Sequence, residues 1–175
     1  MTRSDDAFIH RLTVASVPRT GQNVVLKAST THCAQIAIDL GIPSIARLDA
    51  HFTVTPSRSG VFSVTGVVSA DLEQLCVVSL EPFQMAVSET VDLRYQDEAK
   101  LAAPGKKEVE RTLDEEDPPE PIIGGIIDLG ALAVEFVALA LDAFPRKPGV
   151  AFASDAEGGK SDNPFAVLAK LKVNP

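Results

Sequence analysis

Alternating apolar and polar positions between residues 45 and 95 are the clearest pattern along the chain. A period of two before and after a turn at 56–60 predicts an antiparallel hairpin with one buried and one solvated face. A more buried strand is expected at 72–80 and a further alternating strand at 85–95. Tight connections between consecutive strands predict a meander. The apolar positions of the hairpin are Leu48, Ala50, Phe52 and Val54, then Phe62, Val64, Gly66, Val68 and Ala70.

Helical spacing appears in two stretches. Near residues 31–40, a Thr can cap a helix that Gly41 and Pro43 close. Its apolar face consists of Cys33, Ile36, Ala37 and Leu40. The second stretch, 122–148, organises the chain: a β-branched run feeds a helix from Leu129 to Phe144, which Pro145 stops. Its polar residues are Asp128, an N-cap, with Glu135 and Asp142 along one narrow stripe. With two carboxylates inside, this stretch is expected to be a core helix and not a membrane span.

These elements predict an α+β fold in which an antiparallel sheet packs against two main helices, near 31–40 and 129–144. Residues 8–17 and 45–95 supply the sheet, a meander for which closure toward a barrel stays open, and a short strand could form at 23–27. We expect one domain over 1–148 with a mobile acidic loop at 97–120. Residues 149–175 are expected to be a flexible linker and a short C-terminal docking helix, with Asn163 as its cap and Pro164 at its first position.

Charge narrows the possible partners. The chain has 24 acidic and 16 basic residues and a net charge of -8, which repels nucleic-acid phosphates at long range. Segment 97–120 alone holds nine acidic and four basic residues, and so carries -5 of that charge. Aromatic residues make up 5% of the chain and Trp is absent, so stacking platforms for bases are scarce. Contact with RNA must therefore be local or pass through another protein.

Reactive side chains give little support to metal or catalytic chemistry. The candidate metal ligands show no Cys-x-x-Cys or His-x3-His spacing, so no metal and no cofactor is expected. These candidates are Cys33, Cys76, His10, His32 and His51. A hydrolase would need a pair such as Ser79 and His51, but no nucleophile elbow surrounds Ser79. Two distant cysteines and an N-terminus without a secretory pattern favour reduced thiols in the cytoplasm.

Several short motifs in order resemble the YceD family, the large ribosomal RNA subunit accumulation proteins, over most of the chain, and most closely its alphaproteobacterial branch. The motifs are Gln74-Leu-Cys-Val-Val-Ser-Leu-Glu-Pro-Phe83, a charged loop, Ile126-Ile-Asp-Leu129, Glu135, Leu139-Ala-Leu141, Pro145-Arg-Lys-Pro-Gly149 and Asn163-Pro-Phe-Ala-Val-Leu-Ala-Lys-Leu-Lys172. Family members often have Cys-x-x-Cys where this chain has Cys76-Val-Val-Ser79, so a shared zinc role is not expected here. The resemblance offers structural or interaction positions and no catalytic set. These positions are Cys76, Leu80, Glu81, Asp128, Leu129 and Glu135.

The resemblance implies a bacterial cytoplasmic non-enzyme that supports synthesis, processing or stability of large-subunit ribosomal RNA. Together with the charge, it predicts binding to a basic ribosomal protein or ribosome assembly factor, with ribosomal RNA contacted indirectly and neither DNA nor membrane bound. Two alternatives stay open: a small acidic chaperone that holds a client on an apolar helix face, and, with less support, a hydrolase that uses Ser79 or His51.

Overall fold

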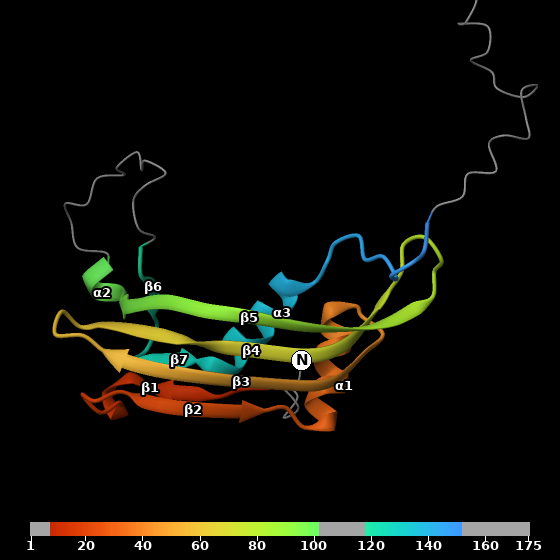
Figure 1. The fold of residues 1–175 in the computed structure, drawn as a ribbon. Coiled ribbons are helices and arrows are strands. Elements are labelled where there is room, and N and C mark those ends of the chain that lie inside the picture. The colour runs from red at the N-terminus through yellow and green to blue at the C-terminus, as the bar shows by residue number, and fades with distance from the viewer. Residues whose placement is uncertain (1–7, 102–117, 152–175) are drawn as a thin grey trace, which may run out of the picture.

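A five-stranded sheet in the order β2-β3-β4-β5-β6 forms the body of the protein (Figure 1). The computed structural model describes residues 8–101 and 118–151. The strands are β2 (Gln22–Lys27), β3 (Ser44–Pro56), β4 (Val61–Leu75), β5 (Pro82–Asp97) and β6 (Glu120–Ile122). The first four pair antiparallel, whereas β6 runs parallel to β5. The sheet is therefore mixed, with β2 and β6 at its edges.

The long strands follow the alternation in the sequence. On β3 and β4, the apolar positions face the core and their neighbours face outward, as the pairing of Val54 with Val64 illustrates. Phe52 lies opposite Gly66, where any larger residue would push its Cβ into the His51 carbonyl oxygen and to 3.0 Å from the Phe52 Cα. Gly66 thus allows the two strands to approach next to the largest fully buried side chain. The buried strand expected at 72–80 is instead the end of β4 followed by a turn.

A second, two-stranded sheet joins parts of the chain that are far apart in sequence. Strand β1 (Arg11–Thr13) pairs antiparallel with β7 (Ile126–Asp128), and a short 3-10 helix, η1 (Val14–Ser16), follows β1. Leu12 and Ile127 from this pair are buried in the main core. The prediction that residues 8–17 belong to the main sheet is wrong, because the extended segment is only three residues long and its partner is β7.

Helices α1 (Thr30–Leu40) and α3 (Leu129–Ala140) cover the inner face of the main sheet, and α2 (Glu98–Leu101) is a single turn after β5. The Ser29 side chain caps α1 by accepting a hydrogen bond from the His32 amide at 3.1 Å. Gly41 ends that helix with φ 66°, a left-handed conformation that suits glycine. Helix α1 packs against β3, and α3 packs against β4 and β5. None of the helices in these described residues is long and apolar enough to cross a membrane.

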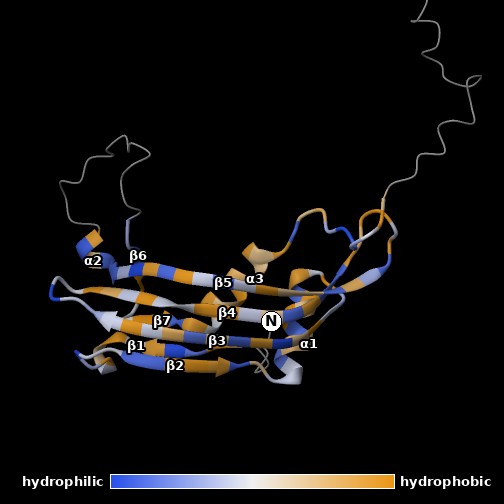
Figure 2. Cartoon of the chain, viewed as in Figure 1, coloured by the Kyte–Doolittle hydropathy of each residue, from blue (hydrophilic) through white to orange (hydrophobic). Residues whose placement is uncertain are grey.

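One aliphatic core lies between the main sheet, the two long helices and the β1-β7 pair. Its members come from almost every element, which is why a chain without Trp can still bury a continuous interior. Figure 2 shows the alternation along the strands and the largely apolar character of α3. Side chains that are almost completely buried include Leu48, Ala50, Phe52, Val54, Val64, Val68, Val91, Leu129 and Val137.

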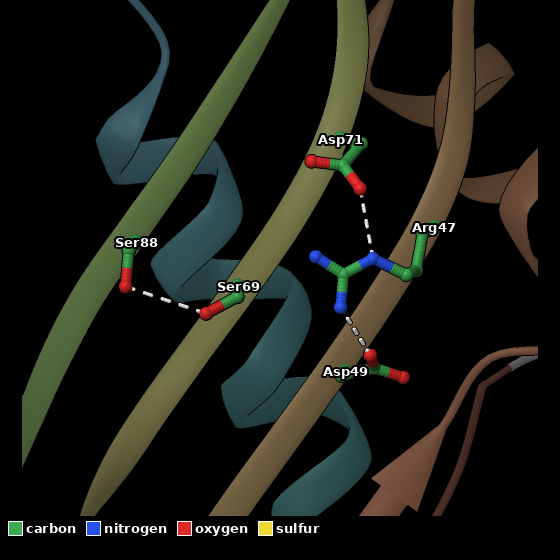
Figure 3. A network of polar contacts seen from close by, with 5 residues as sticks. All are labelled: Arg47, Asp49, Ser69, Asp71 and Ser88. Atoms are coloured by element: carbon green, nitrogen blue, oxygen red, sulfur yellow. Dashed lines mark hydrogen bonds and ion pairs between the residues drawn. The ribbon is translucent and has the colours of Figure 1, made fainter.

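The outer face of the sheet carries polar side chains that bond across the strands. The Arg47 guanidinium contacts the Asp49 carboxylate at 2.6 Å and the Asp71 carboxylate at 2.8 Å, while Ser69 and Ser88 lie within 3.3 Å of each other (Figure 3). All five side chains lie on the side turned away from α3. Because these ion pairs are exposed, they add little stability and mainly satisfy the solvated face.

The predicted fold class is wrong in its arrangement. The sheet is mixed and not an antiparallel meander, a separate two-stranded sheet is present, and the described residues hold three α-helices where two main helices were expected. The parallel strand has a topological cause: residues 98–119 separate β5 from β6, and parallel neighbours require a crossover of at least a dozen residues. Between β6 and β7, the chain turns at Gly124 and Gly125, which both have positive φ.

Much of the predicted domain plan falls outside the described residues. That applies to most of the acidic segment at 97–120 and to the C-terminal segment from residue 152 onward. The described ends of the acidic segment are Asp97 with α2, and Pro118 and Pro119 before β6. The mobile loop and the docking helix stay predictions.

Candidate functional site

The six candidate positions fall into two groups. Cys76, Leu80 and Glu81 lie in the turn between β4 and β5, which we call the Cys76 turn (residues 76–81). The other three belong to α3: Asp128 is its N-cap, Leu129 its first residue, and Glu135 lies in its second half. The first three positions lie close together, whereas the α3 positions have three different environments.

The Cys76 turn closes on itself through its backbone. The Cys76 amide donates to the Glu81 carbonyl at 2.9 Å, and the Leu80 amide donates to the Cys76 carbonyl at 2.9 Å. Leu80 has φ 57°, the left-handed region that residues other than glycine seldom adopt. Its side chain is exposed, so the unusual backbone conformation serves the closure of the turn and not the burial of the leucine.

The segment that follows α3, residues 142–147, is attached to the Cys76 turn. The Val77 amide donates to the Pro145 carbonyl at 2.9 Å, and the Gln74 side-chain amide donates to the Asp142 carbonyl at 3.1 Å. Near the surface, the Lys147 ammonium pairs with the Glu81 carboxylate at 2.9 Å. The turn therefore holds the exit of α3 through contacts between residues about 70 positions apart.

The Cys76 sulfur is the centre of this attachment. It accepts hydrogen bonds from the Ser79 amide at 3.4 Å and from the Lys147 amide at 3.3 Å. These contacts stabilise the thiolate and lower the pKa of Cys76 from the ordinary 9.0 to about 6. The largest contribution comes from the adjacent Ser79 hydroxyl, followed by the amide donors. Cys33 in the core under α1 is buried like Cys76, but there burial outweighs the one backbone hydrogen bond, with Leu48, and raises the pKa of the thiol.

Metal binding does not fit the Cys76 turn. Ser79 occupies the place where a second thiol would complete a Cys-x-x-Cys pair. Cys33, the other cysteine, lies in the core under α1. Within residues 8–101 and 118–151, no group of three or more His, Cys, Asp or Glu side chains could hold a metal ion. The sulfur acts here as an acceptor for amides and offers only one of the ligands that a zinc site needs.

Asp128 and Leu129 have structural positions at the start of α3. The Asp128 carboxylate accepts from the amides of Gly130 at 3.0 Å and Ala131 at 3.1 Å, and also from the His10 amide at 3.0 Å. It thereby caps α3 and fixes the N-terminal segment to it. Leu129 is fully buried in the core.

Glu135 is on the exposed side of α3, beside a groove of about 280 Å³ between this helix and strands β5 and β6. The pKa of Tyr95 in this groove is raised to about 12, mainly by burial and to a smaller extent by the charges of Glu120 and Glu135. Tyr95 and Glu120 are positions that the sequence analysis missed. The only available signal was that the sole tyrosine of the chain ends the alternating pattern of β5, next to the acidic segment.

The residues proposed for hydrolysis do not meet. His51 is exposed in the middle of β3, opposite Val67, whereas Ser79 is beyond the end of β4. Val67 and Cys76 are nine residues apart along the chain, a distance of roughly 30 Å at the usual rise per residue of a strand. These two side chains therefore cannot form a nucleophile-base pair. Another candidate ligand, His32, completes the cap of α1 and contacts the Phe8 ring at a centroid distance of 5.4 Å.

Comparison with known proteins identifies a family. Residues 64–172 match the model of the family described as large ribosomal RNA subunit accumulation protein YceD. The matched range contains most of β4, the Cys76 turn, β5, the acidic segment, α3 and the C-terminal segment. No curated protein matches, and no solved structure does.

Proposed function

The chain belongs to the YceD family of large ribosomal RNA subunit accumulation proteins, and from that premise we propose that it acts by binding a basic protein and not by catalysis. The family name indicates a role in accumulation of the RNA of the large ribosomal subunit. The finer proposal is that the partner is a ribosomal protein or an assembly factor and that the RNA is contacted indirectly. A cytoplasmic location is part of this proposal.

The observation that carries the proposal is the family match over residues 64–172, more than half of the chain. The match includes the Cys76 turn and α3, whose described side chains cap, pack and hydrogen-bond within the fold. Such a set supports a rigid binding body. It does not provide the converging acid, base and nucleophile of an active site.

Charge supports a cationic partner. The net charge of -8 repels a phosphate backbone, whereas it accelerates encounter with a positively charged protein surface. The segment at 97–120 contributes -5 of this charge and connects two neighbouring strands, β5 and β6, so its two ends enter the fold side by side. This segment is therefore the proposed element of attraction.

The test neutralises the acidic segment without shortening it. In the variant, the acidic residues between α2 and β6 become amides; they are Glu108, Glu110, Asp114, Glu115, Glu116 and Asp117. A matched control carries residues 102–117 in scrambled order with all charges kept. Cells depleted of the protein are complemented with each version, and their ribosomal particles are separated on sucrose gradients. Recovered ribosomal proteins are identified by pull-down at low and high salt.

We expect depletion to reduce the large-subunit peak, and wild type and the scrambled control to restore it. The neutralised variant should capture less basic protein, most visibly at low salt, because screening already weakens the wild-type attraction at high salt. A normal large-subunit peak after depletion contradicts the family role for this chain. Capture that is independent of both charge and salt contradicts the acidic segment as the attractive element. Recovery of one unrelated client protein in place of ribosomal proteins would favour the chaperone alternative.

A further inference from the structure

The groove beside α3 combines an apolar floor with two carboxylates. Leu93 and Tyr95 of β5 line one side, and Phe136 and Leu139 of α3 line the other. Leu139 is 72% exposed, whereas the other two leucines of α3, Leu129 and Leu132, are buried. The groove thus leaves apolar surface uncovered between β5 and α3.

The two carboxylates at the groove lack a cation among the described residues. Glu120 comes from β6 and Glu135 from α3, so elements distant in sequence bring them together around Tyr95. Neither side chain forms an ion pair with any residue in the part of the chain that the structure describes. An occupant that fits this groove would present apolar side chains together with positive charge.

The C-terminal part of the chain has this composition. Phe165, Leu168 and Leu171 recur every three residues, and Lys170 and Lys172 accompany them without a nearby acid after Asp162. Spacing of this kind gathers the apolar side chains toward one side of a helical segment and leaves the lysines beside them.

We propose that the C-terminal segment 163–172 binds in the α3-β5 groove, with its apolar side chains over Phe136 and Leu139 and its lysines toward Glu120 and Glu135. A segment tethered to its own groove needs no second molecule, and the tether raises its effective concentration there. The inference goes beyond the proposed function, since it assigns this groove to the chain itself and not to the basic partner.

The tether is long enough for this contact. Eleven residues, 152–162, separate the last described residue from the segment, and an extended chain of that length spans up to about 40 Å. Leu139 at the groove is twelve residues before Ala151, so these two residues are at most about 40 Å apart, a distance that the extended tether can span. The tether is therefore long enough to bring the C-terminal segment to the groove.

Two other hollows of the described surface fit the segment less well. A hollow of about 350 Å³ on the sheet contains Asp71 and Glu73, but Arg47 already pairs with Asp71, and the Ser44 hydroxyl donates to Glu73 at 2.9 Å. The groove of about 460 Å³ beside α1 is lined by apolar, Ser and Thr residues and has no carboxylate. Of these three, the α3-β5 groove alone offers unpaired negative charge next to exposed apolar surface.

The composition of the chain permits a direct optical test in the full-length protein. It contains one tyrosine, Tyr95, which lines the groove, and no tryptophan. In the Phe165→Trp variant, excitation of Tyr95 should therefore produce sensitised tryptophan emission, and that emission should be blue-shifted by contact with apolar surface. A Phe152→Trp variant places the same reporter in the tether and should show neither effect.

Charge reversal then tests the specific contact. Adding Lys170→Glu and Lys172→Glu to Phe165→Trp should shift the bound-to-free ratio by about fivefold, a change expected when two exposed ion pairs are replaced by repulsion. Further reversal of Glu120→Lys and Glu135→Lys should restore the sensitised emission. The proposal is overturned if the tryptophan emission of the Phe165→Trp variant resembles that of free tryptophan, if the tether reporter gives an equal signal, or if the double reversal fails to restore it. None of these readouts depends on ribosomes, so their failure is distinguishable from failure of the proposed function.

Discussion

The two ends of α3 are both attached to remote parts of the chain, but by different kinds of contact. At the N-terminal end, Asp128 receives three amide hydrogen bonds, and Gly130 lies directly against the backbone of residues 8–10. At the C-terminal end, the Cys76 turn holds residues 142–147 through a sulfur acceptor, backbone bonds and one exposed ion pair. The first end is held by a carboxylate that caps the helix, whereas the second is held around the buried sulfur of Cys76, with one exposed ion pair beside it.

The largest effect is expected at Gly130. A Cβ at this position would collide with the Phe8 carbonyl oxygen and lie 2.8 Å from the His10 nitrogen, both of them backbone atoms that cannot rotate away. Gly130→Ala should lower the free energy of unfolding by about 3 kcal/mol, measured by urea denaturation, despite the better helix propensity of alanine. The neighbouring exposed Ala131→Gly serves as control and should cost about 1 kcal/mol. A Gly130 variant as stable as wild type would show that the N-terminal segment is free to move away.

Loss of the cap should have an intermediate effect. Asp128→Ala removes the acceptor for the Gly130, Ala131 and His10 amides and should lower the free energy of unfolding by about 1–2 kcal/mol. Asp128→Asn retains an acceptor oxygen and should recover most of that loss. If both substitutions were equally harmful in urea denaturation, the charge of the carboxylate and not its hydrogen bonds would be the important property.

At pH 7, about one unit above the folded pKa, the effect of Cys76 should not exceed that of the cap, and it should grow at higher pH, so that it appears as a dependence on pH. Because the folded pKa of about 6 lies below the ordinary 9.0, the folded state binds fewer protons than the unfolded state between these values. The stability of the wild type should therefore rise as pH increases from 6 to 9, and this contribution should be lost as pH falls through 6. Cys76→Ser should flatten this part of the profile, measured as urea midpoints across that range. An unchanged slope in the variant would assign the effect to another group.

The difference between the ends also explains what the sequence could predict. The N-terminal end of α3 is predictable from neighbouring residues: Asp128 before an apolar helical pattern predicts an N-cap, and the structure confirms it. The alternation around Phe52 likewise identified β3, and Gly41 marked the end of α1. Each of these features depends on residues within a few positions of one another.

Long-range contacts account for the errors. Three long-range features rest largely on backbone amides and carbonyls: the pairing of β1 with β7, the parallel position of β6, and the attachment of residues 142–147 to the Cys76 turn. Such groups occur at every residue, so no side-chain pattern distinguishes the correct partner. The same applies to the α3-β5 groove, where Glu120 and Glu135 meet only because β6 and α3 are brought together.

The bond between His10 and Asp128 spans 118 positions and has a consequence for synthesis of the protein. Strands β2 to β5 can pair in order as they emerge, but β1 has no partner until β7 has been translated. At about 5–20 residues per second, that interval is on the order of ten seconds. During this time α3 is not yet available to cover the inner face of the sheet. The nascent chain is therefore most prone to aggregation just before its final third leaves the ribosome.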